Sequence, residues 1–129
     1  MTGPAALWQF LPLGYLLTTA IEMPVLWLGL SRRHSPGDRI AAGLWLTAVT
    51  YPIVVVALPL ALAPWRSQFA CLACAETFAP LAECGLFYLA FIGRSAVDVR
   101  ATRRDLAAIV IANLTSFGCG EALWRALGS

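Results

Sequence analysis

Hydrophobic positions along the chain fall in four long blocks that shorter polar segments separate. The blocks cover about residues 7–30, 40–63, 71–93 and 106–126. Each has the ~20 residues that a helix needs to cross a hydrocarbon core. We therefore expect an all-α fold, a bundle of four transmembrane helices.

The composition favours the same interpretation. Of the 129 residues, 60% are hydrophobic and 12% are charged, whereas about a quarter of the residues in a soluble domain are charged. A chain this short cannot enclose so much apolar surface in one core, so the excess must face lipid. We predict one transmembrane domain over residues 1–129, which makes the chain a multi-pass membrane protein.

The first block does not have the pattern of a cleaved signal peptide. It is longer than a secretory apolar region, and the sequence MTGPAALWQF at its start contains no Arg or Lys. We therefore expect this block to remain in the protein as a membrane span.

All nine basic residues are Arg, and they are unevenly distributed between the blocks. Short Arg-rich loops stay on the cytoplasmic side of a membrane. We therefore expect both chain ends on the exterior side of a bacterial-type inner membrane. The two Arg-rich loops also carry Asp and lack interleaved aromatic residues, which argues against nucleic-acid binding. They contain Arg32, Arg33, Arg39, Arg94, Arg100, Arg103 and Arg104, while Arg66 and Arg125 lie on the other side.

Four Glu lie inside the apolar blocks: Glu22, Glu76, Glu83 and Glu121. An ionisable side chain inside a membrane is costly unless it faces a bundle interior, a partner or water. Glu76 and Glu83 are close to two helical turns apart, so they share one helix face. The helical rise per residue places Glu22 and Glu83 near mid-depth, and Glu76 and Glu121 in the outer third as an outer vestibule.

Three explanations of these Glu remain open. They can be neutral and hydrogen-bonded to polar partners, as structural contacts between helices. They can line a path for protons or cations. They can also complete a site together with another subunit.

Two pairs of passages resemble each other in the same order along the chain. IEMPVLWLGLSR (21–32) resembles AECGLFYLAFIGR (82–94), and TAVTYP (47–52) resembles NLTSFG (113–118). The matched positions are Glu22 with Glu83, Trp27 with Tyr88, Thr47 with Asn113, and Thr50 with Ser116.

These matches predict an internal repeat of two helical hairpins, about residues 7–63 and 71–126. Because each hairpin has two spans, both copies have the same orientation, and an axis along the membrane normal relates them.

The matched polar positions fall at one predicted depth. Pro24, Pro52 and Pro80 lie inside the spans and can release backbone carbonyls, which protein or water must then satisfy. We predict an intramembrane polar or ion site formed by Glu22, Glu83, Thr50, Asn113, Thr47 and Ser116.

The cysteines provide a second, weaker candidate. Cys71 and Cys74 form a C-x-x-C at the exterior start of the third block, and Cys119 lies in the outer half of the fourth. They can be small packing residues, a structural disulfide, or a redox or soft-metal site. The only His, His34, lies in a cytoplasmic loop, where we expect it in solvent.

Motifs of conventional catalysis are missing. The sequence has no H-E-x-x-H, no phosphate-binding Gly loop and no Ser-His-Asp set. We therefore expect no cofactor, and we expect a non-enzymatic protein in preference to an enzyme.

Three functional hypotheses follow. The first is a proton or cation channel or carrier, with the bilayer as its surroundings and a homo-oligomer or larger complex as its assembly, because four helices enclose little volume. The second is a non-transporting membrane subunit or assembly factor that docks on a larger membrane complex. The third is an exterior-facing thiol redox protein that uses the C-x-x-C.

Overall fold

The computed structural model describes residues 4–62, 68–92 and 98–128. Within these ranges, side chains are described except at residues 4–10, 68–69, 71–72, 92 and 124. The described part of the chain is helical and contains no strand. Its elements are α1 (Pro4–Gly29), α2 (Pro36–Pro52), η1 (Ile53–Ala57), α3 (Leu58–Leu62), α4 (Gln68–Phe87), η3 (Tyr88–Ile92) and α5 (Val99–Gly128).

These elements form four continuous rods, because α2, η1 and α3 follow one another without a break, as do α4 and η3. The rods begin three to seven residues before the four apolar blocks of the sequence and end within two residues of them. Three helical stretches in the described residues are long and apolar enough to cross a membrane: Leu11–Gly29, Pro36–Leu62 and Val99–Gly128. The span expected at 71–93 is helical but is not among these three.

Local sequence signals explain where α2 begins and where its rod changes pitch. The Ser35 side chain accepts a hydrogen bond from the Asp38 backbone N–H at 3.1 Å, and Pro36 occupies the first turn, where its missing N–H is not needed. After Pro52 the rod continues as the π-helical segment η1, in which the Leu58 N–H bonds to the Ile53 carbonyl. Such wider turns accommodate a proline without ending the rod.

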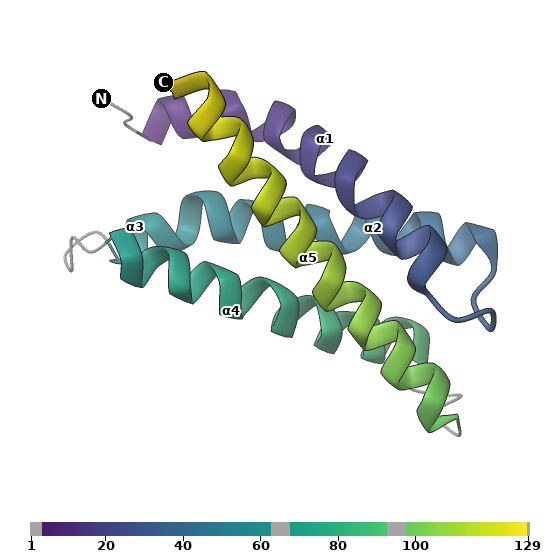
Figure 1. Ribbon diagram of the computed structural model, residues 1–129. Coiled ribbons are helices and arrows are strands. Elements are labelled where there is room, and N and C mark those ends of the chain that lie inside the picture. Colours follow the sequence, from purple (N-terminus) through teal and green to yellow (C-terminus); the bar gives the residue numbers. More distant parts are fainter. Residues whose placement is uncertain (1–3, 63–67, 93–97, 129) are drawn as a thin grey trace.

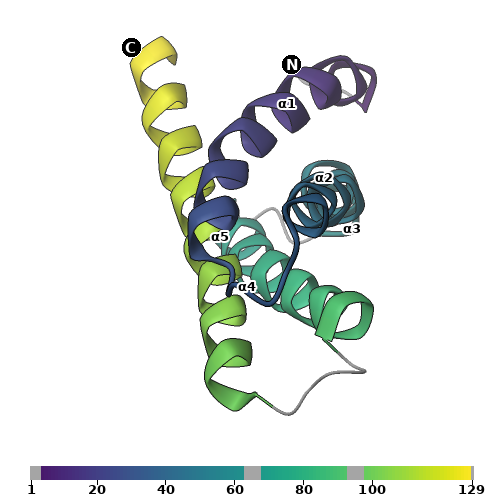
Figure 2. The ribbon, with the colours of Figure 1, turned by 90° about the vertical axis from the view of Figure 1, so that its right-hand side faces the viewer.

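The four rods pack in a ring. α1 packs against α2 and α5, and α4 packs against α2 and α5. Figure 2 views α2 end-on and shows the rods surrounding a common interior. Figure 1 shows the start of α1 and the end of α5 at one end of the bundle. The α1–α2 connection and the start of α5 lie at the opposite end, which we call the loop end.

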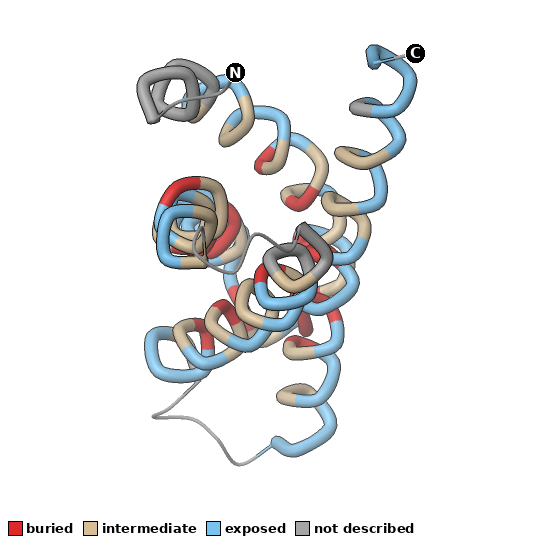
Figure 3. The backbone as a smooth tube through the Cα atoms, turned by 90° about the vertical axis from the view of Figure 1, so that its left-hand side faces the viewer, coloured by how far each residue is buried: buried red, intermediate tan, exposed pale blue. Residues whose placement is uncertain are grey.

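Buried residues occupy the helix faces that turn toward one another (Figure 3). Four of them, one from each rod, are at most 1% exposed and belong to one hydrophobic cluster: Leu26, Leu46, Phe87 and Ile109. Each lies four residues, about one helical turn, from a polar residue that also faces the interior. We call these four residues the apolar layer.

Small residues allow α1 to approach its two neighbours closely. A Cβ atom built on Gly29 would lie 2.8 Å from the Ala108 Cβ of α5, and one on Gly43 of α2 would lie 2.7 Å from the Met23 sulfur of α1. A side chain at Gly29 would clash with Ala108, whereas one at Gly43 would require the flexible Met23 side chain to move. Small residues at helix crossings are typical of helices that associate within a membrane.

Candidate functional site

The interior of the bundle holds a group of polar side chains next to the apolar layer. Glu22 and Glu83 are each only 2% exposed although they are acidic. Acidic side chains are rarely buried this fully unless they are paired or hydrogen-bonded. We call the group the carboxyl centre: Glu22 from α1, Thr47 and Thr50 from α2, Glu83 from α4, and Asn113 and Ser116 from α5.

Both carboxyl oxygens of Glu22 have a hydroxyl partner. Thr47 Oγ1 lies 3.0 Å from Glu22 Oε2, and Ser116 Oγ lies 2.7 Å from Glu22 Oε1. Glu22 therefore links α1 to α2 on one side and to α5 on the other.

Glu83 has an equivalent pair of partners. Asn113 Nδ2 donates to Glu83 Oε2 at 2.8 Å, and Thr50 Oγ1 lies 2.6 Å from Glu83 Oε1. This carboxyl group links α4 to α5 and to α2. The two Glu therefore join all four rods at one level of the bundle.

Three of the partner side chains also bond to carbonyls of their own helices. Thr50 Oγ1 lies 2.9 Å from the Leu46 carbonyl oxygen, and Ser116 Oγ lies 3.0 Å from the Asn113 carbonyl oxygen. Asn113 Nδ2 donates to the Ile109 carbonyl at 2.9 Å. These contacts fix the side-chain directions, since each group is held from two sides.

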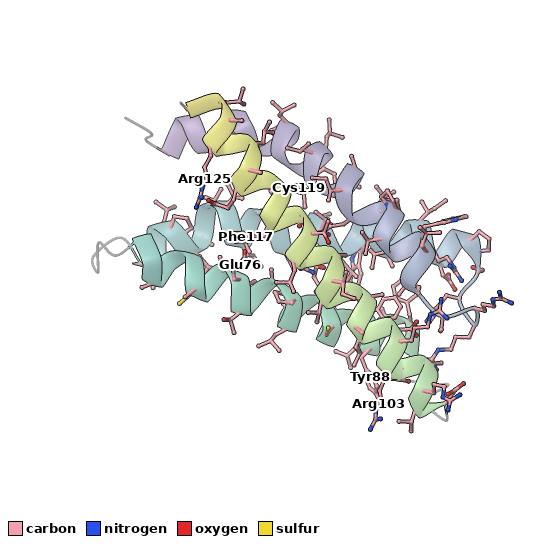
Figure 4. All side chains as sticks on the ribbon, in the orientation of Figure 1. Glu76, Tyr88, Arg103, Phe117, Cys119 and Arg125 are labelled. Carbon is pink, nitrogen blue, oxygen red and sulfur yellow. The ribbon has the colours of Figure 1, made fainter. Side chains whose placement is uncertain are left out.

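A cavity of about 170 Å³ lies against the carboxyl centre. At about 30 Å³ for each water molecule, it has room for several. All six residues of the centre line it, together with Glu76 of α4 and Phe117 of α5 (Figure 4). Among the residues that line this cavity, none carries a positive charge.

The two residues expected in an outer vestibule lie beyond the centre, away from the loop end. Glu76 is half-buried and lines the cavity. Glu121 is half-buried on α5, in a groove that it shares with Arg125. Glu121 does not line the cavity itself.

The cysteines do not gather at a site in the described part of the chain. Cys74 and Cys119 are exposed free thiols (Cys119 is labelled in Figure 4). The side chain of Cys71 lies outside the described residues. The described residues also contain no group of three His, Cys, Asp or Glu side chains that can hold a metal ion.

A second buried polar group, near the loop end, was not expected from the sequence. Asp105 of α5 is 0% exposed. Its Oδ1 accepts a hydrogen bond from the Ser31 N–H at 2.6 Å, and its Oδ2 contacts the side chains of Ser31, Arg33 and His34 at 3.1, 3.0 and 2.7 Å. Arg33 also donates to Thr102 at 2.9 Å. We call these five residues the Asp105 cluster.

The environment of His34 differs from the one expected. Instead of pointing into solvent, His34 is 6% exposed, and its ring packs edge-on against Phe87 at 5.1 Å between centroids. The reason is the Asp105 carboxylate, which gives the imidazole a buried hydrogen-bond partner. The sequence carries one signal of this arrangement, an Asp at the edge of an apolar block opposite an Arg-rich loop.

Two further Arg bind the last carbonyl groups of α1, which no intrahelical partner satisfies. Arg39 donates to the carbonyl of Trp27 and to that of Ser31 just beyond the helix, and Arg104 donates to those of Gly29 and Leu28. Since α1 has no basic residue in its own last turn, α2 and α5 supply the positive charge that a helix C-terminus favours.

Comparison of the chain with protein-family models finds no match. Comparisons with curated proteins and with solved structures find none either.

Proposed function

We propose that this protein is a small membrane protein that takes up protons or small cations at the carboxyl centre and carries them across the bilayer. One observation carries the proposal: two buried carboxyl groups lie beside one cavity whose lining includes no cationic side chain. An intramembrane acid without a positive partner is typical of ion and proton pathways.

The outer surface of the rods supports their placement in a membrane. Trp27 and Tyr88 are 41% and 40% exposed, both near the loop end, where aromatic residues would reach the membrane interface. The described Arg residues other than Arg125 also lie toward this end, which we propose as cytoplasmic. Large apolar side chains are exposed on all four rods, among them Leu13, Leu28, Leu60, Leu89 and Leu114.

The contacts of the carboxyl centre support the proposed repeat of two hairpins. Glu22 contacts Thr47 within its own hairpin, and Glu83 contacts Asn113, the position matched to Thr47, within the other. Across the hairpins, Glu22 contacts Ser116. Glu83 correspondingly contacts Thr50, the position matched to Ser116. Each contact therefore has its counterpart under the sequence match.

The surroundings of the centre favour a carrier over an open channel. The cavity extends from the centre toward Glu76, on the side away from the loop end. On the other side, the apolar layer fills the bundle at 1% exposure or less. An ion held at the centre would therefore exchange with one side only, and the layer must open for it to reach the other.

Flux across proteoliposomes tests the proposal. The purified protein is reconstituted, a proton or cation gradient is imposed, and an entrapped fluorescent indicator reports the flux. We expect Glu83→Gln to abolish flux, because Gln keeps the shape of Glu but cannot exchange a proton. Glu76→Gln should lower flux less, because bulk water can replace a group that only concentrates ions. Thr115→Ala, which removes a hydroxyl bonded only to its own helix at Ile111, is the matched control.

The competing function is structural. Since every oxygen of the two carboxyl groups already has a protein partner, the centre can act solely to hold four helices together, as in a non-transporting subunit. Full flux in Glu83→Gln, together with loss of folding in Glu83→Leu, would favour this function and remove the support for transport.

A further inference from the structure

The hydrogens available at the carboxyl centre are fewer than its contacts require. A hydroxyl group has one hydrogen to donate. Thr50 Oγ1 nevertheless lies within hydrogen-bond distance of two oxygens, Glu83 Oε1 at 2.6 Å and the Leu46 carbonyl at 2.9 Å. A carbonyl oxygen can only accept. If Glu83 were a carboxylate, it too could only accept, and the two contacts would have to share one hydrogen, which weakens both.

Ser116 presents the same problem at the other carboxyl group. Its Oγ lies 2.7 Å from Glu22 Oε1 and 3.0 Å from the Asn113 carbonyl. One hydroxyl hydrogen again has two acceptors if Glu22 is ionised. The same shortage of hydrogens is therefore seen twice, at hydroxyls on different helices that contact different carboxyl groups.

We infer that Glu22 and Glu83 each hold one proton in this structure, on the Oε1 atoms that face Ser116 and Thr50, and that the carboxyl centre binds two protons per chain. The transport of these protons rests on the proposed function, whereas their presence does not. The inference narrows the transported species from protons or small cations to protons.

With these two protons, every contact becomes a hydrogen bond. Glu83 Oε1–H donates to Thr50, and Thr50 donates to the Leu46 carbonyl. Glu22 Oε1–H donates to Ser116, which donates to the Asn113 carbonyl. The 2.6 and 2.7 Å separations are in the normal range for O–H···O bonds.

The second oxygen of each carboxyl group then acts as a pure acceptor. Glu22 Oε2 accepts from the Thr47 hydroxyl, and Glu83 Oε2 accepts from the Asn113 amide. The other amide hydrogen of Asn113 bonds to Ile109. No hydrogen and no contact in the centre is left over.

The charges around the centre also favour two neutral carboxyl groups. Two other titratable side chains line the cavity, Tyr51 of α2 and Glu76 of α4, and Cys84 of α4 lies near Glu83; none of the three is a cation. Glu121 and Arg125 of α5 share a separate groove farther from the loop end. Two ionised carboxylates in one interior repel each other, and no positive group lines the cavity to offset them.

A bound metal cation fits the same contacts poorly. Hard cations such as Ca²⁺ take six to eight oxygen ligands, with lone pairs turned toward the ion. Here each of the four carboxyl oxygens is engaged by a different hydroxyl or amide group. Both carboxyl protons would have to leave, and the Thr47 hydroxyl hydrogen and the Asn113 amide would have to turn away, before a metal ion could bind.

Release of a proton has a defined structural consequence. When Glu83 Oε1 gives its proton to a water molecule in the cavity, the products are a carboxylate and a hydronium ion. Thr50 then turns its only hydrogen from the Leu46 carbonyl to the carboxylate. Proton release from Glu83 therefore breaks the hydrogen bond from Thr50 to the carbonyl of Leu46, a residue of the apolar layer. Release from Glu22 correspondingly breaks the hydrogen bond from Ser116 to the Asn113 carbonyl in α5.

Infrared difference spectroscopy of the protein in vesicles at neutral pH tests the two protons directly. Exposed Asp and Glu are ionised at this pH. We expect two carbonyl bands of protonated carboxyl groups, both shifted in D₂O, one lost in Glu22→Gln and the other in Glu83→Gln. Ser116→Ala should move only the Glu22 band, and the control Thr115→Ala should move neither. The wild-type spectrum is informative even where a variant folds poorly.

Two results would overturn the inference: no protonated-carboxyl band at neutral pH, or a single band that either Gln substitution removes, which would indicate one shared proton. Vesicle flux separates this inference from the proposed function. Sodium or potassium flux without proton flux overturns the narrowing of the transported species to protons and keeps transport. Two bands without flux of any ion keep the inference and overturn transport.

Discussion

The carboxyl centre and the Asp105 cluster are both buried, acidic and built from several helices, but they satisfy their acids in opposite ways. Asp105 accepts from a guanidinium, an imidazole, a hydroxyl and a backbone N–H, and an ion pair with Arg33 at 3.0 Å offsets its charge. Glu22 and Glu83 have only hydroxyl and amide partners.

This difference supports a structural role for Asp105 and the proposed proton exchange at Glu22 and Glu83. A carboxylate surrounded by donors and a cation is stable as an anion, and removing its charge strands the donors. A carboxyl group between hydroxyls can be neutral or ionised, because hydroxyls both donate and accept. The Asp105 cluster therefore fixes the helices, while the carboxyl centre can change its proton content without losing its partners.

Replacing each acid by its amide tests this comparison with the largest expected effect. In Asp105→Asn, one oxygen becomes an NH₂ group that faces existing donors, and we expect a loss of about 3 kcal/mol in the free energy of unfolding. Glu83→Gln should cost less than about 1 kcal/mol, because a protonated carboxyl already donates one hydrogen. Denaturant unfolding in detergent measures both, with Asp38→Asn at an exposed site as control. Equal losses at the two positions would contradict the comparison.

Removing the whole carboxyl group of Glu83 should destabilise the protein, as we expect for the substitution in the Asp105 cluster. Glu83→Leu leaves one Asn113 hydrogen without an acceptor and breaks the links from α4 to α2 and α5. We expect a loss of about 2 kcal/mol relative to Glu83→Gln. The same unfolding assay compares the two variants. If the Glu83→Leu variant is as stable as the Glu83→Gln variant, the hydrogen bonds of Glu83 add nothing to the stability of the bundle.

A smaller effect is expected for a single partner. Thr47→Val keeps the shape of the side chain but removes the hydroxyl that lies 3.0 Å from Glu22. We expect a loss of about 1 kcal/mol in unfolding free energy. Thr115→Val, on the outer side of the network, is the control and should change stability less. A larger loss of unfolding free energy in Thr115→Val than in Thr47→Val would contradict the prediction, because the hydroxyl that contributes more to stability would then lie outside the carboxyl centre.

The smallest effect concerns the capping of α1. Arg104→Gln removes the positive charge from the Gly29 and Leu28 carbonyls at the end of the helix. We expect a loss of about 0.5 kcal/mol that shrinks at high salt, because Arg104 is exposed. Arg103→Gln, also exposed, should have no such effect. A salt-independent loss would point to packing rather than charge.

The sequence was informative about features that depend on one helix at a time, such as where a helix lies in the chain and how far along it a residue falls. The apolar blocks located the rods to within a few residues, and helix geometry put Glu22 and Glu83 at one level, beside the cavity that the structure contains. It was uninformative about Asp105 and His34, which lie 71 residues apart in the chain. A His in an Arg-rich loop looks solvated until the last helix brings a carboxylate to it.

The pairing within the carboxyl centre was also beyond the sequence. Thr47 and Thr50 share one face of α2, and nothing local distinguishes the one that meets Glu22 from the one that meets Glu83. That choice depends on how α2 is rotated against α1 and α4, which the local sequence of α2 does not reveal.

The hydrogen bonds that α5 makes at the end of α1 have a consequence for biosynthesis. The Asp105 carboxylate that binds the Ser31 N–H lies 74 residues later in the chain, and the Arg104 guanidinium that binds the Gly29 carbonyl lies 75 residues later. The ribosome therefore delivers both groups long after the first hairpin has emerged. Until α5 is made, the Gly29 carbonyl lacks its Arg104 donor and Arg33 lacks its Asp105 partner, so we expect a chain that ends before residue 104 to be prone to misfolding.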